Sequence, residues 1–202
     1  MTDHYYSKNP QSKKIPVELT CMLKGNEFRL LASAGVFSKN NIDFGTRTLI
    51  DAFRLPNADG NVLDLGCGYG AIGLAMAKAY PDRFITMADV NERAVELAKE
   101  NAARNNVVNV DIYQSDGFKQ VPSKKFAAIL TNPPIRAGKQ VIYKWFEESA
   151  NYLAKDGELW IVVQKKQGAP SMKTFLSEIF REVETVTHKK GYHIFRAKHV
   201  KD

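Results

Sequence analysis

The segment Thr131-Asn132-Pro133-Pro134 places a side-chain amide directly before two prolines. Proline has no N–H and a fixed φ, so the pair holds the backbone extended and limits where its carbonyl groups point. Asn132 then offers a side-chain acceptor beside a fixed backbone acceptor. Two converging acceptors suit a donor with two hydrogens, such as an amino group on a conjugated, planar system. Because bonding both hydrogens localises the lone pair of that nitrogen, the segment predicts an amine nitrogen as the atom that reacts.

A glycine-rich turn is the second chemical feature. The sequence Val62-Leu63-Asp64-Leu65-Gly66-Cys67-Gly68-Tyr69-Gly70-Ala71 reads as a short strand, a turn and the start of a helix. Its spacing matches Gly-x-Gly-x-x-Gly/Ala, in which glycines let a ligand approach the backbone closely. Asp89 ends the next predicted strand, where an acid can bind ribose hydroxyls. Both features fit NAD as well, so they predict a nucleoside cofactor without naming it.

Two further acids narrow the choice of cofactor. A carboxylate at Asp64, beside the turn, would repel a pyrophosphate but suits the ammonium group of an amino-acid moiety. Asp116 follows the third strand and can accept a hydrogen bond from an adenine amine. Taken alone, Asp116 is equally well explained as a turn former before Gly117. Together the acids favour S-adenosylmethionine.

The elements that position these residues alternate between strands and helices from residue 61 onward. Strands are predicted at Asn61–Leu65, Arg83–Val90, Val110–Ser115, Phe126–Thr131 and Glu158–Gln164, and helices at Ala71–Tyr80, Glu92–Asn105, Lys139–Ala154 and Ser171–Phe180. This alternation predicts a parallel, doubly wound sheet that binds ligands outside the carboxyl ends of its strands. The last two strands, Glu182–His188 and Tyr192–Lys198, are too close in sequence for a helical crossover, so we expect them to pair antiparallel.

The first sixty residues are less regular. Leu19–Leu23 and Glu27–Leu31 flank Lys24-Gly25-Asn26, which predicts a hairpin. After a turn-rich stretch, Thr46 is predicted to cap a helix that stops before Pro56. We therefore expect a single domain over residues 1–202, with a hairpin, loop and helix over 1–60 and the cofactor-binding core over 61–202.

Composition adds a few constraints. The net charge is +7, from 29 Lys and Arg against 22 Asp and Glu. This charge favours a polyanionic partner, although a solvated basic surface explains it equally well. No apolar run approaches the roughly 20 residues of a membrane span, and the two cysteines, Cys21 and Cys67, have no metal-ligand spacing. We expect a cytoplasmic monomer without a metal or membrane contact.

The ordered motifs Asp64-Leu65-Gly66-Cys67-Gly68, Asp89, Asp116 and Asn132-Pro133-Pro134 resemble those of class I amino methyltransferases. The resemblance is closest to RsmC-type ribosomal small-subunit guanine-N2 methyltransferases and spans most of the chain. It includes Gly35-Val36-Phe37-Ser38, Asp43-Phe44-Gly45-Thr46 and Lys166-Gln167-Gly168-Ala169. It implies an α/β, Rossmann-like fold with a seven-stranded, mostly parallel sheet, an antiparallel C-terminal hairpin and a small N-terminal extension. It also implies S-adenosylmethionine as methyl donor and the exocyclic N2 amine of a guanine in ribosomal RNA as acceptor, with the small ribosomal subunit favoured.

The resemblance also assigns roles to individual residues. The cofactor-binding set is Asp64, Gly66, Gly68, Asp89, Val90, Asp116 and Gly117, with Phe37 and Thr46 from the N-terminal region. Asn132 and the carbonyl of Pro133 would hold the target amine, and Pro134, Ile135, Arg136 and Lys139 would bind the substrate. Ile135 stands where the family usually has the Tyr or Phe that stacks on the target base. The stacking partner is therefore open, with Phe37 as a candidate.

Some family members carry an extra domain before the catalytic one, so RNA docking here is expected to use the basic surface, with Lys165-Lys166 and Lys189-Lys190 as further candidates. An amino methyltransferase acting on adenine N6 or on protein glutamine would use the same motif, although Ile135 mildly disfavours a stacked adenine. An NAD-binding reductase is disfavoured, because this sequence has no evident Tyr-x-x-x-Lys proton donor beside Asn-Pro-Pro. The intact acids argue against a non-catalytic RNA-binding domain.

Overall fold

The computed structural model describes residues 16–33, 42–122 and 125–201, and of Arg136 only the backbone. Its main feature is a seven-stranded sheet with the order β5-β4-β3-β6-β7-β9-β8. The strands are β3 (Asn61–Leu65), β4 (Ile85–Asp89), β5 (Val110–Gln114), β6 (Phe126–Thr131), β7 (Leu153–Gln164), β8 (Phe180–Lys189) and β9 (Tyr192–Val200). β3 to β7 run parallel, whereas β9 is antiparallel to both β7 and β8. This confirms the predicted sheet and its antiparallel ending.

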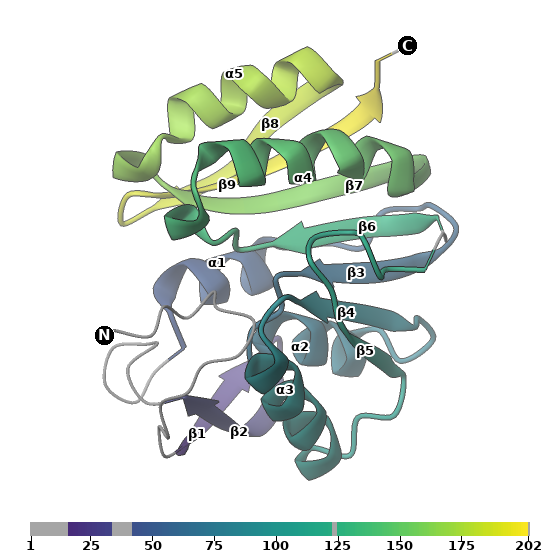
Figure 1. Ribbon diagram of the computed structural model, residues 1–202, viewed down its shortest axis with the longest axis vertical. Helices are drawn as coiled ribbons and strands as arrows, with labels where there is room; N and C mark the ends of the chain where they lie inside the picture. Colours follow the sequence, from purple (N-terminus) through teal and green to yellow (C-terminus); the bar gives the residue numbers. More distant parts are fainter. Residues whose placement is uncertain (1–15, 34–41, 123–124, 202) are drawn as a thin grey trace.

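Helices cover both faces of the sheet (Figure 1). One apolar core joins α1 (Phe44–Ala52), α2 (Ala71–Ala79) and α3 (Glu92–Arg104) to one face, and a second joins α4 (Lys139–Tyr152) and α5 (Ala169–Ile179) to the other. β6 lies at the centre and is buried along its whole length. Leu130 belongs to the first core and Ile129 to the second, as expected for a strand covered on both faces.

The order of the strands also locates the point at which the sheet is expected to bind its ligand. β3 has β4 on one side and β6 on the other, so the chain reverses its direction of winding between β3 and β6. Ligands of doubly wound sheets bind outside the carboxyl ends of the strands at such a reversal. The glycine turn follows β3 and the Asn-Pro-Pro segment follows β6, so both lie at this point.

Some element boundaries differ from those predicted. Asp43, not Thr46, caps α1, and its carboxylate accepts hydrogen bonds from the backbone N–H of Gly45 and of Thr46, each at 2.9 Å. The prediction for Thr46 was wrong because an aspartate three residues earlier satisfies the free N–H groups of the first turn. β7 begins at Leu153, which pairs with Phe126, five residues before the predicted start.

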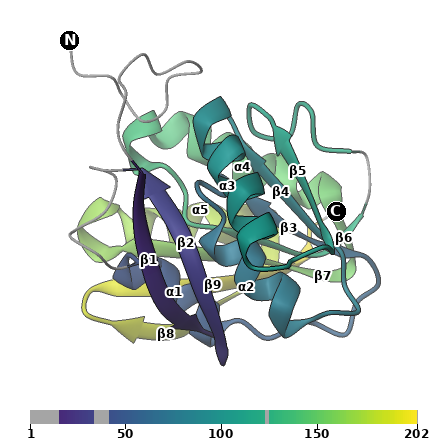
Figure 2. The same ribbon diagram turned by 90° about the horizontal axis from the view of Figure 1, so that it is seen from below.

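The N-terminal hairpin consists of β1 (Pro16–Leu23) and β2 (Asn26–Ser33), joined by a turn at Lys24-Gly25. It forms a separate two-stranded sheet, seen in front in Figure 2. Its side chains Leu23, Phe28 and Leu30 enter the same apolar core as α2 and α3. The hairpin thus packs on the helices that follow the glycine turn.

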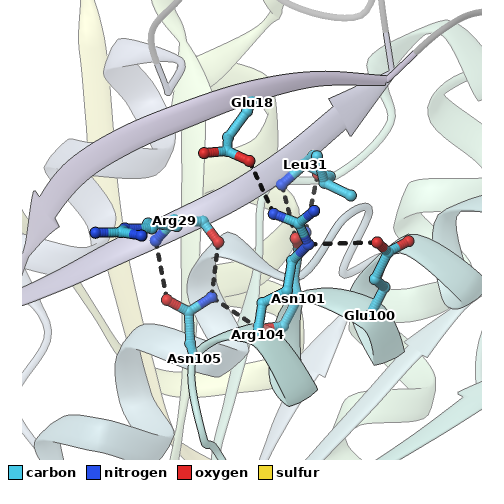
Figure 3. A network of polar contacts seen from close by, with 7 residues as sticks. All are labelled: Glu18, Arg29, Leu31, Glu100, Asn101, Arg104 and Asn105. Carbon is cyan, nitrogen blue, oxygen red and sulfur yellow. Dashed lines mark hydrogen bonds and ion pairs between the residues drawn. The ribbon is translucent and has the colours of Figure 1, made fainter.

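Asn101 of α3 and Asn105, which caps the C-terminus of that helix, bind the edge of β2 (Figure 3). The amide of Asn105 accepts from Arg29 N at 2.9 Å and donates to Arg29 O at 2.8 Å. Asn101 makes the same pair of bonds with Leu31, at 2.7 and 2.9 Å. One helical turn separates the two asparagines and two strand residues separate their partners, so both spacings are close to 6 Å. The side chains therefore satisfy the strand edge much as a neighbouring strand would.

Asn101 also connects the hairpin to the cofactor turn. Its Nδ2 donates a second hydrogen bond, 2.8 Å long, to the carbonyl of Tyr69. Arg104 adds ion pairs at 2.8 Å to Glu18 and 3.3 Å to Glu100, but both are exposed and contribute little. The buried asparagine is the stronger link between β2 and the glycine turn.

Candidate active site

The glycine turn between β3 and α2 has the backbone conformation that its sequence requires. Gly66, Gly68 and Gly70 have φ values of 74°, 56° and 99°, a region that residues with a Cβ rarely adopt. The backbone N–H groups of Gly66 and Cys67 both donate to Ala88 O, at 2.8 and 2.9 Å, which ties the turn to β4. The turn is thus held tightly against the neighbouring strand.

Asp89, at the end of β4, bridges the glycine turn and α3. One carboxylate oxygen accepts from Gly68 N at 2.8 Å and the other accepts from Asn91 N at 2.9 Å. Burial raises the pKa of Asp89, while these backbone hydrogen bonds act to lower it. The next residue, Val90, is half-buried, and its carbonyl accepts from Gln114 Nε2 at 3.2 Å. The predicted ribose contact therefore lies directly beside the glycine turn.

Asp64 is buried under the turn, with 1% of its surface exposed. Its Oδ2 accepts from Gly73 N in α2 at 2.8 Å, whereas Oδ1 is buried without a hydrogen-bond partner in the part of the chain that the structure describes. Burial raises its pKa to about 7. A buried acceptor without a donor is costly, and an ammonium group would supply that donor. The residues at the turn therefore fit the amino-acid part of S-adenosylmethionine.

Asp116 and Gly117, which are predicted to contact the adenine, follow β5. The carboxylate of Asp116 is about half exposed and pairs with Lys119 Nζ at 2.7 Å. Gly117 has a φ of 60°, and its carbonyl accepts from Ser115 Oγ at 2.7 Å. The Asp-Gly pair thus both forms a turn and leaves a carboxylate at the carboxyl edge.

Trp145 of α4 lies against both cofactor turns. A Cβ on Gly117 would be 2.7 Å from the indole Nε1, and a Cβ on Gly66 would be 3.3 Å from the ring. Trp145 is 8% exposed, and its Nε1 makes no hydrogen bond to any residue that the structure describes. Trp145 was not among the predicted site residues, because an aromatic residue on the apolar face of a helix gives no sign of what it packs against.

Asn132 is held in one orientation by the start of α1. Its Nδ2 donates to Asp43 Oδ2 at 3.0 Å and to Thr46 Oγ1 at 2.9 Å. An ionised carboxylate only accepts, so the amide nitrogen must face Asp43 and the carbonyl oxygen must face away. Thr131 Oγ1 donates to Leu65 O at 2.8 Å and ties the segment to β3. Asp43 is therefore a site residue that the sequence analysis gave no role, and Thr46, predicted to contact the cofactor, contacts Asn132.

The carbonyl groups of the two prolines differ in their hydrogen bonding among the described residues. Pro134 O accepts from Ala137 N at 2.8 Å and begins a short 3-10 helix, η1 (Ile135–Ala137). No described residue donates to the carbonyl of Pro133. Asn132 Oδ1 and Pro133 O are thus two acceptors on consecutive residues. A Cβ on Gly66 would lie 4.0 Å from Pro134 Cδ, so the Asn-Pro-Pro segment adjoins the cofactor turn.

The other predicted substrate residues have different surroundings. Ile135 packs against the apolar core beneath α4 and α5. Lys139 is exposed at the first position of α4. Arg136 belongs to η1, but its side chain lies outside the description, as does Phe37. The contacts predicted for these residues stay predictions.

Within residues 16–33, 42–122 and 125–201, no three His, Cys, Asp or Glu side chains are grouped so as to hold a metal ion. None of the helices described is long and apolar enough to cross a membrane.

The sheet order, the glycine turn and the acids at the strand ends define a Rossmann-like methyltransferase. Comparison with known proteins agrees with this class. The family model "Methyltransferase small domain" matches residues 27–196. The chain is 54% identical over 201 residues to "Uncharacterized protein YbxB" of Bacillus subtilis, covering 99% of this chain and 100% of that protein. It is 32% identical to "Ribosomal RNA small subunit methyltransferase C" of Hamiltonella defensa, covering 81% of this chain and 48% of that protein.

A solved structure is similar in fold. The T. thermophilus 16S rRNA N2 G1207 methyltransferase (RsmC), in complex with AdoMet and guanosine, superposes with a TM-score of 0.78 at 21% sequence identity. The match covers 95% of this chain and 52% of that one, so the chain spans about half the length of the RsmC proteins it matches. The chain belongs to the methyltransferase small domain family, and it is a methyltransferase that uses S-adenosylmethionine.

Proposed function

We propose that this protein methylates the exocyclic N2 amine of a guanine in ribosomal RNA, in the small subunit. The observation that carries the proposal is the orientation of Asn132, whose Nδ2 is bound by Asp43 and Thr46. Asn132 Oδ1 is left as an acceptor, and the carbonyl of the next residue, Pro133, receives no hydrogen bond from any residue that the structure describes. The names of the matched relatives support ribosomal RNA as the substrate class.

The two acceptors act on the nitrogen that receives the methyl group. S-adenosylmethionine supplies an electrophilic methyl group on a sulfonium. The guanine N2 amine is a weak nucleophile, because its lone pair is delocalised into the ring. Asn132 Oδ1 and Pro133 O each accept one hydrogen of the amine and favour a pyramidal nitrogen with a localised lone pair. Fixed acceptors reorganise little during the reaction, which is where most of their benefit lies.

Asp43 and Thr46 serve as positioning residues in this proposal. Without them the Asn132 amide could turn over and present its NH₂ group to the amine, donor against donor. In the cofactor site, Asp64 would bind the ammonium group, Asp89 the ribose hydroxyls and Asp116 the adenine amine. The unpartnered Oδ1 of Asp64 supports the first of these assignments.

We also infer the setting in which the protein works. The N-terminal hairpin and the helices after the glycine turn share one apolar core, which supports a single methyltransferase domain over residues 1–202. A ribosomal RNA substrate would place the protein in the cytoplasm. We propose that it acts there as a monomer.

The test is methylation of ribosomal RNA in vitro. Small ribosomal subunits and naked 16S RNA, both from cells that lack the protein, are incubated with it and isotopically labelled S-adenosylmethionine, and the nucleosides are identified by mass spectrometry. The proposal expects N2-methylguanosine. Label in N6-methyladenosine or in protein glutamine would instead establish one of the alternatives. As a control, Asn132→Ala should bind the cofactor with near-normal affinity in calorimetry and transfer no methyl group.

A further inference from the structure

The carboxyl edge of the sheet carries lysines from three separate chain segments. We call them the lysine rim: Lys139 at the start of α4, Lys165 and Lys166 in the 3-10 helix η2 (Lys165–Gln167), and Lys189 and Lys190 at the β8–β9 turn. All five are exposed. The β8–β9 turn and the starts of α4 and α5 lie at the left in Figure 1, at the edge toward which β6 points.

Backbone contacts bring these segments together. Lys165 N donates to Gly191 O at 2.7 Å, which joins η2 to the β8–β9 turn. A Cβ on Gly168 would lie 3.9 Å from Lys139 Nζ, so the first residue of α4 reaches the junction of η2 and α5. The rim is therefore one surface, although its members are up to 51 residues apart in sequence.

The basic residues of β9 itself are neutralised by acids of β8. Arg196, in the middle of β9, pairs with Glu184, and Lys198, near its end, pairs with Glu182 at 3.0 Å. No rim lysine forms an ion pair with any carboxylate in the part of the chain that the structure describes. A cluster of cations without acids repels itself and attracts an anionic partner.

The rim reaches the residues that hold Asn132. Lys190 Nζ lies 4.8 Å from the ring centroid of Phe44, the residue directly after Asp43. The Phe44 ring in turn packs at 5.8 Å from the ring of Tyr192, which follows the β8–β9 turn. An anionic chain bound along the rim would therefore pass close to the acceptors of Asn132 and Pro133.

We propose that the lysine rim binds the phosphates of the RNA strand that flanks the target nucleotide. This inference rests on the proposed RNA substrate and names the surface that docks it. Phosphate contacts supply most of the affinity for a nucleic acid and fix its register without reading its sequence. The rim thus positions the strand, and the pair of acceptors selects the amine.

The test compares two variants with the same change in net charge. The rim variant carries Lys165→Gln, Lys189→Gln and Lys190→Gln. The control variant carries Lys99→Gln, Lys125→Gln and Lys155→Gln, three exposed lysines in α3, before β6 and in the early part of β7. Each variant lowers the net charge from +7 by three. Affinity for in vitro transcribed 16S ribosomal RNA is measured over a range of salt concentrations, and cofactor affinity is measured by calorimetry.

The rim variant should lose about tenfold or more in RNA affinity. Its plot of log affinity against log salt has a negative slope, which should become less steep by about 2, because each of the three lost contacts with a single strand contributes about 0.7. The control variant should keep the slope of the wild type, and both variants should bind the cofactor normally. Equal losses in the two variants, or an unchanged rim variant, would overturn the inference while methylation of RNA by the wild type upholds the proposed function. A wild type that neither binds nor methylates RNA would refute both.

Discussion

Replacing Asn132 by aspartate tests the contact that orients the proposed catalytic amide. The substitution keeps the shape of the side chain but places a second carboxylate against Asp43, at the position where Nδ2 and Oδ2 are now 3.0 Å apart. At an effective dielectric constant near 20, two charges at this distance repel by about 5 kcal/mol, and solvent at the half-buried site reduces this to about 3 kcal/mol. One of the two carboxyl groups in the folded variant should therefore keep its proton to a higher pH than a free aspartate does, so its pKa is raised by the repulsion.

The sign of the effect on stability follows from this raised pKa. The unfolded chain releases the proton near pH 4, whereas the folded variant holds it to a higher pH. Asn132→Asp should therefore be about as stable as the wild type near pH 4, and less stable by about 3 kcal/mol at a pH above the raised pKa of the folded variant. Urea unfolding of both proteins across this pH range measures the difference.

A double variant provides the control for this prediction. Asp43→Asn combined with Asn132→Asp exchanges donor and acceptor, and should recover much of the stability that the single variant loses at high pH. If Asn132→Asp follows the wild-type stability at every pH, or the double variant is no more stable than the single one, then Asp43 does not hold Asn132. The orientation argument for the acceptor would then fail.

Three other measurements examine the surrounding structure. Burial raises the pKa of Asp64 to about 7, so the carboxyl group stays protonated in the folded protein at pH values where it ionises in the unfolded chain. The stability of the wild type relative to Asp64→Asn should therefore fall as the pH rises from about 4 to about 7. A stability difference that does not change with pH would contradict the burial argument. Trp145 lies against both cofactor turns, so S-adenosylmethionine should change the tryptophan fluorescence of the wild type. It should not change that of Trp145→Phe, in which Trp160, which is buried, is the remaining tryptophan. An equal change in both proteins would place the cofactor away from Trp145. Asn101→Ala leaves the backbone N–H and carbonyl of Leu31 without their partner and should lower the unfolding free energy by about 1–3 kcal/mol. The amide hydrogen of Leu31 should then exchange faster than in the wild type. An unchanged exchange rate would show that this hydrogen bond does not hold the hairpin.

Regular local patterns in the sequence were enough to predict most of the architecture. The bounds of β3 and β6 agree with the structure to the residue, and the short link between β8 and β9 predicts their antiparallel pairing. These signals are local, because strand length, glycine position and turn length act between near neighbours in the chain. The α1 cap was misplaced for a related reason, since Asp43 and Thr46 are both good capping residues and only the backbone conformation decides between them.

Residue type and spacing were also enough to predict which side chains have the chemistry for the cofactor and the amine. Parallel strands end at one edge, so Asp89, Asp116 and Asn132 could be expected there from their positions after strands. The side chains that contact these residues are known only from the tertiary structure. Asp43 meets Asn132 across 89 residues, and Trp145 lies between two turns that precede it by many residues. Such contacts depend on the order of strands and on which helix packs on which face, and neither is encoded in the spacing of neighbouring residues.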